Sequence, residues 1–310
     1  MTNEDPYPGA ARGKNDMIGA FNLTAISGVR AALDLLDLKP SKALGQNFLI
    51  DANILAIILN AAALDPADKV LEIGAGLGVL TEALAKIAGH VAAIEKDRRL
   101  CDFLKARFQD FPNVELISGD ALKLDLEKFW RSGVNKMAAN LPYSVGSVIL
   151  ADIFKGAEKP ERIVVTLQNE VACRLVAEPD TSDYGLLSIW RRLDYDGDIR
   201  KKISASCFYP NPEVQSAVVC LTRRAGKISP RDRDYFFGLT KYAFSQRRKQ
   251  LQKILSRAPA EFNCPADILR NLLVEMRLNP CARPEELSLE QWVMLSDRVA
   301  ERIQRNPSAI

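Results

Sequence analysis

Short apolar segments alternate with amphipathic ones from about Val70 to Ala177, and this alternation constrains the fold more than any other feature of the sequence. The amphipathic stretches, such as DRRLCDFLKARFQ from Asp97, have the spacing of helices, whereas the apolar segments have the length of buried strands. Strands that alternate with helices predict a mostly parallel sheet covered on both faces. We expect its first strands at VLEI (70–73), HVAAIE (90–95), VELISGD (114–120), MAANLPYS (137–144) and RIVVTLQ (162–168).

The pattern changes after Ala177. Two further strands are expected around 193–204 and 214–222, and no long helix separates them, so at least one antiparallel neighbour is expected. RRAGKISPRD (223–232) then breaks the composition with Gly and Pro. The two segments beyond it, YFFGLTKYAFSQRRKQLQKILSRA and ADILRNLLVEMRL, have helical spacing and predict a small helical domain.

Composition excludes several kinds of protein. The 310 residues are 47% hydrophobic and 26% charged, which is typical of soluble proteins, and the length favours one large and one small domain. Six cysteines are scattered without a C-x-x-C pair, which favours reduced thiols and a cytoplasmic location over a disulfide or zinc framework. His90 is the only histidine, so a Ser-His-Asp triad or an H-E-x-x-H site is excluded and no metal is expected.

The N-terminal segment, residues 1–21, mixes acids, bases, Pro and Gly before any apolar run. This composition does not suit a secretory signal, and we expect a flexible extension. The longest apolar stretches are too short and too interrupted to span a bilayer, so no membrane association is expected.

The net charge is only +3, but basic residues gather in the second half of the chain. On one continuous helix, Lys249, Lys253 and Arg257 would share a face. Each cluster alone is compatible with a solvated surface, but together they favour a polyanionic partner. The clusters are Arg191–Arg192, 200–202, Arg223–Arg224 and 247–249.

A glycine-rich turn, EIGAGLGVLT (72–81), follows the first strand and opens the next helix. Gly74, Gly76 and Gly78 let the backbone pass close to a ligand. Val79 stands where the dinucleotide fingerprint needs its third glycine, and no Gly-Lys-Ser/Thr follows, so the turn is neither that fingerprint nor a P-loop. Alone, it is equally compatible with a cofactor site and with a tight structural turn.

Acidic residues end the next two strands. Glu95 lies 21 residues after Gly74, where a carboxylate can bind both hydroxyls of a ribose, and Asp120 can accept from an adenine amine. Either acid alone is compatible with a helix cap or a solvated loop, but ligands of such sheets bind at the strands' carboxyl ends, where all three elements fall. S-adenosylmethionine fits them, because it combines ribose, adenine and a cationic methionine without a phosphate.

NLPY (140–143) follows the fourth strand and can hold an adenine for reaction at its exocyclic amine. This nitrogen is a poor nucleophile because its lone pair is delocalised into the ring. The Asn140 side-chain oxygen and the Leu141 carbonyl can accept its two hydrogens. Pro142 can fix the turn, and Tyr143 can stack on the extracted base. Positioning and electrostatics then carry the catalysis without histidine; the alternative is a structural Pro turn with a buried aromatic.

These motifs, taken together and in this order, resemble the ribosomal RNA small-subunit adenine dimethyltransferases, the KsgA-type enzymes linked to kasugamycin sensitivity. The resemblance runs from about Ser41 to the last helix. It implies a class I S-adenosylmethionine-dependent methyltransferase fold, Rossmann-like with a seven-stranded, mostly parallel sheet, and a smaller all-α C-terminal domain. The segments that carry it are KALGQNFLID, EIGAGLGVLT, IEKD, GDAL, NLPY, LQNEVACRL, YGLLS, FYPNPEVQSAVV and FSQRRKQLQ.

The resemblance also implies an activity and its residues. Two methyl groups would be transferred to each of two adjacent adenines near the 3′ end of small-subunit (16S) rRNA, late in subunit assembly. Phe208 would form a second aromatic wall for the base, although a core Phe is the alternative. The cofactor would be bordered by Asn47, Leu49, Gly74, Gly76, Glu95, Asp120 and Asn140, and rRNA phosphates would be contacted by Arg247, Arg248 and Lys249.

The expected organisation is an extension (1–21), a methyltransferase domain (22–224) and a helical rRNA-binding domain (225–310), in a monomer. Three alternatives stay open. A large-subunit adenine methyltransferase of the macrolide-resistance type shares the glycine turn and the NLPY-type motif. An assembly factor with weak activity would bind immature subunits, and a small-molecule methyltransferase would act on a free nucleoside.

Overall fold

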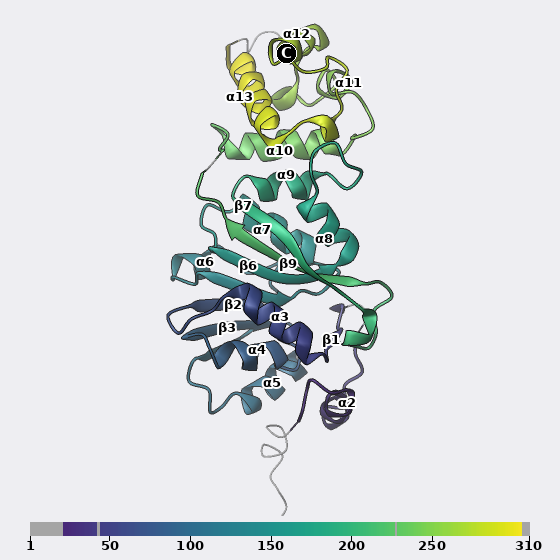
Figure 1. Cartoon of the computed structure of the whole chain (residues 1–310). Helices are drawn as coiled ribbons and strands as arrows, with labels where there is room; N and C mark the ends of the chain where they lie inside the picture. Colours follow the sequence, from purple (N-terminus) through teal and green to yellow (C-terminus); the bar gives the residue numbers. More distant parts are fainter. Residues whose placement is uncertain (1–20, 42–43, 227, 306–310) are drawn as a thin grey trace, which may run out of the picture.

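The computed structural model describes residues 21–41, 44–226 and 228–305, so most of the predicted extension lies outside the described residues. In Figure 1 a sheet flanked by helices fills the middle of the molecule, with α10 to α13 beyond α9 at one end and α2 at the other. The strands are β1 (Phe48–Leu49), β2 (Lys69–Ile73), β3 (His90–Glu95), β4 (Val114–Ser118), β5 (Lys136–Asn140), β6 (Arg162–Gln168), β7 (Tyr195–Ile203), β8 (Phe208–Tyr209) and β9 (Ser216–Arg223).

The helices alternate with the strands as expected, and only helices follow β9 in the described part of the chain. They are α2 (Ile26–Leu35), α3 (Ala52–Ala62), α4 (Val79–Ala85), α5 (Arg98–Arg107), α6 (Glu127–Arg131), α7 (Gly146–Lys155), α8 (Asn169–Val176), α9 (Leu186–Arg192), α10 (Arg233–Phe244), α11 (Leu251–Leu255), α12 (Ala266–Glu275) and α13 (Leu289–Arg305). Short 3₁₀ turns lie at Ala205–Cys207, Ala260–Phe262 and Pro284–Glu286.

Seven strands form one sheet in the order β4-β3-β2-β5-β6-β9-β7. The first five are parallel to one another, whereas β9 is antiparallel to both β6 and β7. The fold class, the seven strands and the antiparallel partner predicted after Ala177 are therefore confirmed. The strand order reverses direction between β2 and β5, and the ligand site of such sheets lies outside the carboxyl ends at that point.

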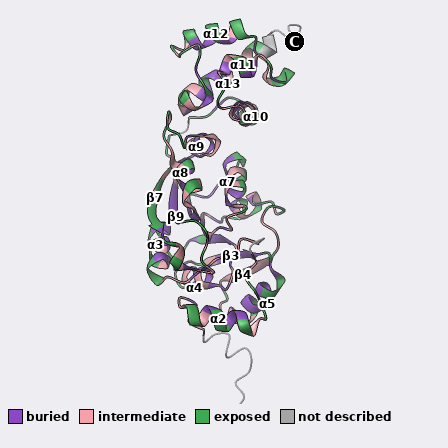
Figure 2. Cartoon of the chain, turned by 90° about the vertical axis from the view of Figure 1, so that its right-hand side faces the viewer, coloured by how far each residue is buried: buried purple, intermediate pink, exposed green. Residues whose placement is uncertain are grey.

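Helices cover both faces of the sheet, and successive side chains of each strand point to opposite faces. Val70, Val91 and Ala138 pack under α3 and α4, whereas Leu71, Ala92 and Met137 pack against α7 on the opposite face. Figure 2 shows buried residues on the helix sides that face the sheet and exposed residues outside. Strands covered on both faces need nearly continuous apolar runs, and this need explains why they could be located from sequence.

The C-terminal helices continue the apolar core of the sheet. Trp190 of α9 stacks edge-on against Phe237 of α10 at 5.1 Å, and its indole nitrogen donates to the Thr240 hydroxyl at 3.0 Å. The same hydrophobic cluster extends from β2 to α13. The predicted C-terminal helices are present, while their assignment to a separate domain that begins at residue 225 stays a prediction.

One expectation about these helices is wrong. α10 ends at Phe244 and α11 begins at Leu251, so YFFGLTKYAFSQRRKQLQKILSRA is not one helix. The chain turns between them, and the Leu251 N–H donates to the Ala282 carbonyl instead of continuing the ladder of α10. Lys249 precedes α11 and Arg257 follows it, so these residues do not share a helix face.

A small second sheet pairs β1 with β8. Leu49 lies opposite Phe208, and Phe48 lies opposite Tyr209. This antiparallel pair joins the segment before α3 to the loop before β9, so residues about 160 apart in sequence meet beside the carboxyl end of the main sheet. Two-residue strands carry no periodic signal, and the sequence did not predict them.

Candidate active site

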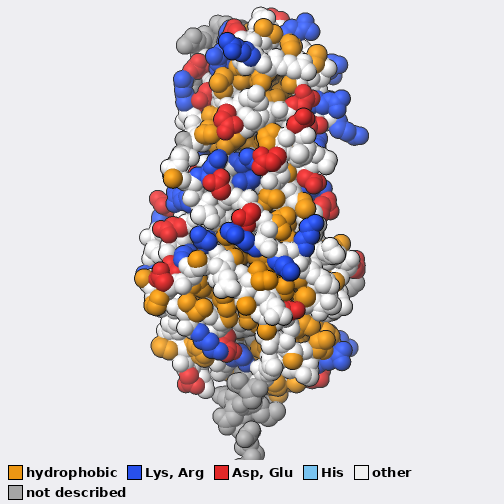
Figure 3. All heavy atoms as spheres, in the orientation of Figure 1, with side chains coloured by type: hydrophobic (Ala, Val, Ile, Leu, Met, Phe, Trp, Pro, Cys, Tyr) orange, Lys and Arg blue, Asp and Glu red, His pale blue; other side chains and the backbone are white. Residues whose placement is uncertain are grey.

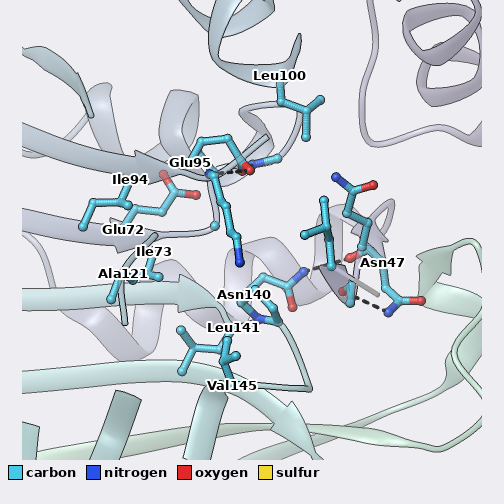
Figure 4. Close-up of a pocket in the computed structure, with 18 of the residues that line it drawn as sticks. Asn47, Glu72, Ile73, Ile94, Glu95, Leu100, Ala121, Asn140, Leu141 and Val145 are labelled. Carbon is cyan, nitrogen blue, oxygen red and sulfur yellow. Dashed lines mark hydrogen bonds between the residues drawn. The ribbon is translucent and has the colours of Figure 1, made fainter. Parts of the chain in front are cut away.

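A pocket opens at the carboxyl ends of β2, β3, β4 and β5 (Figure 4). It brings together every residue predicted to border the cofactor and all those predicted to hold the base, except Phe208. The glycine turn, the residues that follow β3 and β4, the turn after β5 and the segment before α3 form its walls. The lining residues are 44–49, 72–77, 79, 80, 94–96, 100, 119–122, 140–145 and 149.

The glycine turn is shaped by backbone angles that favour glycine. Gly74 and Gly76 have φ values of +81° and +60°. A Cβ atom on Gly74 would lie 3.3 Å from Pro142, and one on Gly76 would lie 3.3 Å from the Phe48 ring. Both positions favour glycine, because their φ values are positive and because the glycine turn packs directly against the NLPY turn and β1.

Glu95 ends β3 with its carboxylate held by three backbone donors. The N–H of Gly76 donates to one oxygen at 2.8 Å, and those of Lys96 and Asp97 donate to the other at 2.8 and 2.9 Å. Burial raises the pKa of Glu95, while these N–H donors oppose the rise. The carboxylate is thus fixed in direction at the pocket wall.

Asp120 follows β4 on the more open side of the pocket. One carboxylate oxygen lies 3.0 Å from Nζ of Lys96, and the other accepts from the Leu122 N–H at 3.1 Å. The hydrogen bond from Lys96 lowers the pKa of Asp120, so its carboxylate is charged and can accept hydrogen bonds at neutral pH.

Glu72 is a pocket-lining acid to which the sequence assigned no role. It is 1% exposed, and its Oε2 atom has no hydrogen-bond partner among the described residues. Burial raises the pKa of Glu72 to about 8, and the charge of Glu95 adds to the rise. The Glu72 carboxyl is therefore mostly protonated in the free protein at pH 7, and a cationic ligand beside it, such as the methionine portion of S-adenosylmethionine, would favour its ionised form. The signal was an acid within the apolar run VLEI.

Asn140 ends β5, and its amide has a defined orientation (Figure 4). Its Nδ2 donates to the Asn47 carbonyl at 3.0 Å. A carbonyl oxygen can only accept, so the amide nitrogen must face Asn47 and Oδ1 is left as the acceptor. This is the atom that the sequence predicted to accept from the adenine amine.

The remaining NLPY residues build a short turn into α7. The Pro142 carbonyl accepts from the N–H groups of Val145 and Gly146, and Leu141 is 1% exposed in the core. Tyr143 lines the pocket, and its hydroxyl lies 2.5 Å from the Ser216 hydroxyl. Burial raises the pKa of Tyr143, so the phenol stays neutral.

Phe208 is placed differently from the expectation. Its side chain is fully buried in the cluster that includes Leu49, Ile58 and Val164, and it does not line the pocket. The pairing of β8 with β1 puts Phe208 opposite Leu49, so the strand that borders the pocket is β1. The alternative interpretation, a core Phe, describes this position.

The segment before β1 contains residues that line the pocket and to which the sequence assigned no role. The Gln46 side chain donates to a carboxylate oxygen of Asp97 at 3.3 Å and accepts from the Ser41 N–H at 2.8 Å. Gly45 has a φ of +64°, and a Cβ there would lie 3.3 Å from the Tyr143 nitrogen. The segment is therefore bonded to Asp97 at the start of α5 on one side and packs on NLPY on the other.

The basic clusters divide into structural and exposed groups. Arg191 is 3% exposed and donates to the carbonyls of Leu175 and Tyr195, and it is therefore a core residue. Arg248 and Lys249 are exposed in the turn between α10 and α11, and Arg247 donates to the Ser182 carbonyl. Figure 3 shows Lys and Arg mixed with Asp and Glu over the face it presents, without one dominant basic patch.

Within the described residues, no group of three or more His, Cys, Asp or Glu side chains could hold a metal ion. No helix in the part of the chain that the structure describes has the length and apolar character needed to cross a bilayer.

The sheet order and the pocket that the glycine turn forms at the carboxyl ends of the strands are those of a class I S-adenosylmethionine-dependent methyltransferase. Comparison with known proteins narrows this class. Residues 38–300 match the family model described as ribosomal RNA adenine dimethylase, and the chain belongs to that family. It is therefore an enzyme that dimethylates adenine in ribosomal RNA, as the resemblance predicted.

Curated relatives and solved structures agree with this assignment. The chain is 37% identical to ribosomal RNA small subunit methyltransferase A of Geobacter metallireducens, over 84% of this chain and 95% of that protein. It is 40% identical to the protein of that name from Dehalococcoides mccartyi, over 83% and 88%. A dimethyladenosine transferase from Plasmodium falciparum has a TM-score of 0.67 at 25% identity, covering 84% of this chain and 98% of that one. The 23S rRNA methyltransferase ErmE has a TM-score of 0.61 at 26% identity, covering 82% and 99%.

Proposed function

We propose that the substrate is small-subunit rRNA and that the enzyme dimethylates two adjacent adenines near its 3′ end, late in subunit assembly. The names of the relatives from Geobacter metallireducens and Dehalococcoides mccartyi support the choice of subunit. The enzyme acts as a cytoplasmic monomer. The similarity to ErmE keeps the large subunit as the second candidate substrate.

The oriented amide of Asn140 is the observation that carries the proposal. Because Nδ2 is committed to the Asn47 carbonyl, Oδ1 accepts a hydrogen from the adenine amine. The Leu141 carbonyl accepts the other hydrogen, and the nitrogen becomes more tetrahedral with its lone pair free to attack. Tyr143 stacks on the extracted base. The residues thus act by positioning and electrostatics, and the proton of the methylated amine is lost to solvent.

The cofactor supplies an electrophilic methyl group on a sulfonium. On the protein side, Glu95 binds the ribose hydroxyls and Asp120 accepts from the adenine amine of the donor. Gly74 and Gly76 allow the close approach of the backbone, and Asn47 and Leu49 close the pocket from the segment before α3. Glu72 offers its unpartnered oxygen to the cationic end.

Labelled S-adenosylmethionine offered side by side to immature small subunits, to large subunits and to free adenosine tests the choice of substrate. We expect label in the small subunit alone, and mapping should place it at two adjacent adenines near the 3′ end. Label in the large subunit would favour the macrolide-resistance type of activity, and label on free adenosine would favour a small-molecule enzyme.

Substitution Asn140→Ala tests the catalytic role. We expect the rate of transfer to fall by about a hundredfold or more, as when an oriented catalytic dipole is removed. Subunit binding in a filter assay should be nearly unchanged. Asn113→Ala is the matched control, because its amide also donates to backbone carbonyls, those of Ala85 and Ala88, away from the pocket. Equal loss of binding and transfer in Asn140→Ala, or intact transfer, would contradict the role. Normal subunit binding with little transfer by the unaltered protein would favour a binding factor.

A further inference from the structure

We propose that Ser216 is a positioning residue that holds the ring of Tyr143 as a fixed wall of the target-base site. The inference rests on the proposed function, in which Tyr143 stacks on the adenine. Its physical basis is the 2.5 Å contact between the two hydroxyl oxygens. The FYPNPEVQSAVV segment, whose other aromatic is buried, thereby gains a role in the site.

Ser216 is anchored more firmly than Tyr143. It is fully buried and begins β9, where it pairs with Gln168 of β6 on one side and with Ile203 of β7 on the other. The carbonyl of the preceding residue, Gln215, accepts from the Asn169 N–H at 2.9 Å. Tyr143 lies in the turn after β5, outside any strand. The hydrogen bond therefore ties a residue of a turn to a fixed point of the sheet.

The bond links the turn after β5 to β9, which is not a neighbour of β5 in the sheet. In the strand order β5-β6-β9, the Tyr143 side chain crosses the end of β6 to reach β9. The backbone of the turn is separately held by the Pro142 carbonyl and by the close packing of Gly45. With both the backbone and the hydroxyl fixed, the ring has one orientation before a base arrives, and less freedom is lost when the base stacks.

This arrangement leaves the face of the Tyr143 ring, and not its hydroxyl, for contact with the base. Its hydroxyl is engaged with a buried serine, and burial keeps it neutral, so the ring contributes its face and not a hydrogen bond to the base. Stacking on a face is indifferent to the substituents on an exocyclic amine. The same wall thus serves the unmethylated and the singly methylated adenine, which a dimethyltransferase must accept in turn.

A double-mutant cycle of Ser216→Ala and Tyr143→Phe tests the anchor. Each substitution removes one hydroxyl of the pair, and we expect each to raise KM for the immature subunit about three- to tenfold, the usual net effect of one hydrogen bond. The double variant should be no worse than either single variant, because both remove the same bond. Loss in Tyr143→Phe with none in Ser216→Ala would overturn the inference, since the phenol would then contact the RNA itself.

Measurements on the free protein keep this inference separate from the choice of substrate. In protein labelled with 3-fluorotyrosine, the Tyr143 resonance, assigned by its absence in Tyr143→Phe, should shift and broaden in Ser216→Ala. Ser216→Cys has a side chain of similar size with a weaker hydrogen-bonding group, so its Tyr143 resonance should lie between those of the parent protein and Ser216→Ala. The control is Ser188→Ala, which removes another fully buried hydroxyl: Ser188 lies in α9 and donates to the Arg174 carbonyl of α8. An unchanged Tyr143 resonance in Ser216→Ala overturns the anchor, whereas absence of small-subunit methylation by the unaltered enzyme overturns the proposed function alone.

Discussion

At the scale of single residues, the acids of the pocket differ in what their surroundings do to them. Asp120 is charged and paired with Lys96, Glu95 is buried but held by three N–H donors, and Glu72 is buried with an unpartnered oxygen. Sequence position identified the first two because each ends a strand. It did not identify the third: the one signal was an acid inside an apolar run, and no spacing rule gives such an acid a role. The same limit applied to Phe208, whose aromatic type suited a wall but whose register on β8 turns it into the core.

Glu72 should make the free enzyme less stable as the pH rises. In the folded protein its pKa is about 8, against a usual value of 4.5, so the unfolded chain releases this proton first. Stability is therefore lost between about pH 4.5 and 8, by at most about 1.4 kcal/mol per pH unit. Glu72→Gln removes this loss, and urea unfolding at several pH values should show the gap between variant and parent widening with pH. Exposed Glu158→Gln controls for the missing charge; a gap that stays constant would contradict the prediction.

Glu95 should dominate donor binding over Asp120. Glu95→Gln replaces an oxygen by an amide that would confront a backbone N–H, and it weakens the charged hydrogen bonds to the ribose. We expect calorimetry to show a loss of affinity for S-adenosylmethionine of about ten- to a hundredfold. Asp120→Asn should cost less, because Asp120 is solvated and already shared with Lys96. The reverse ranking would remove Glu95 from its assigned role.

At the scale of elements, the sequence was most informative where burial is two-sided. The expected strand at 90–95 coincides with β3, and that at 162–168 coincides with β6. A strand buried on both faces needs a nearly continuous apolar run, and such a run is easy to locate in a sequence. The sequence was least informative where a periodic pattern runs through a turn. Between Phe244 and Leu251 the helical spacing continues although the helix does not, since α11 packs against α12 and not in line with α10.

The glycine turn and the NLPY turn should act as one element. Gly74→Ala places a Cβ 3.3 Å from Pro142 at a φ of +81°. The strain is about 1–2 kcal/mol, and relief requires both turns to move. We therefore expect weaker donor binding in calorimetry and a lower kcat at saturating donor. Gly226→Ala is the control, because nothing lies within 4 Å of an added Cβ there. A variant with reduced donor affinity and normal kcat would show that the turns are independent.

At the scale of the whole molecule, the orientation of the helical end is fixed by buried polar contacts as well as apolar ones. Asp194, which follows α9, lies 3.2 Å from Nζ of Lys159 and 2.7 Å from the guanidinium of Arg233 at the start of α10. The Tyr184 hydroxyl donates to the Leu287 carbonyl at 3.0 Å. These contacts connect the helices to the sheet that carries the pocket. A phosphate contact in the turn between α10 and α11 can therefore align the RNA with the NLPY turn.

If the turn between α10 and α11 binds phosphates, the affinity for the subunit should depend on salt concentration through that turn. If Arg247, Arg248 and Lys249 each neutralise a phosphate, replacing all three by Ala should reduce the slope of log affinity against log salt by up to about 2.7, at about 0.9 per contact. The matched control variant removes three positive charges from the edge strand β7, those of Arg200, Lys201 and Lys202, all of which are exposed. Filter binding of immature small subunits at several salt concentrations separates the two. If the β7 variant loses the slope and the turn variant keeps it, the RNA follows the edge of the sheet instead, and the helical end serves the fold more than the substrate.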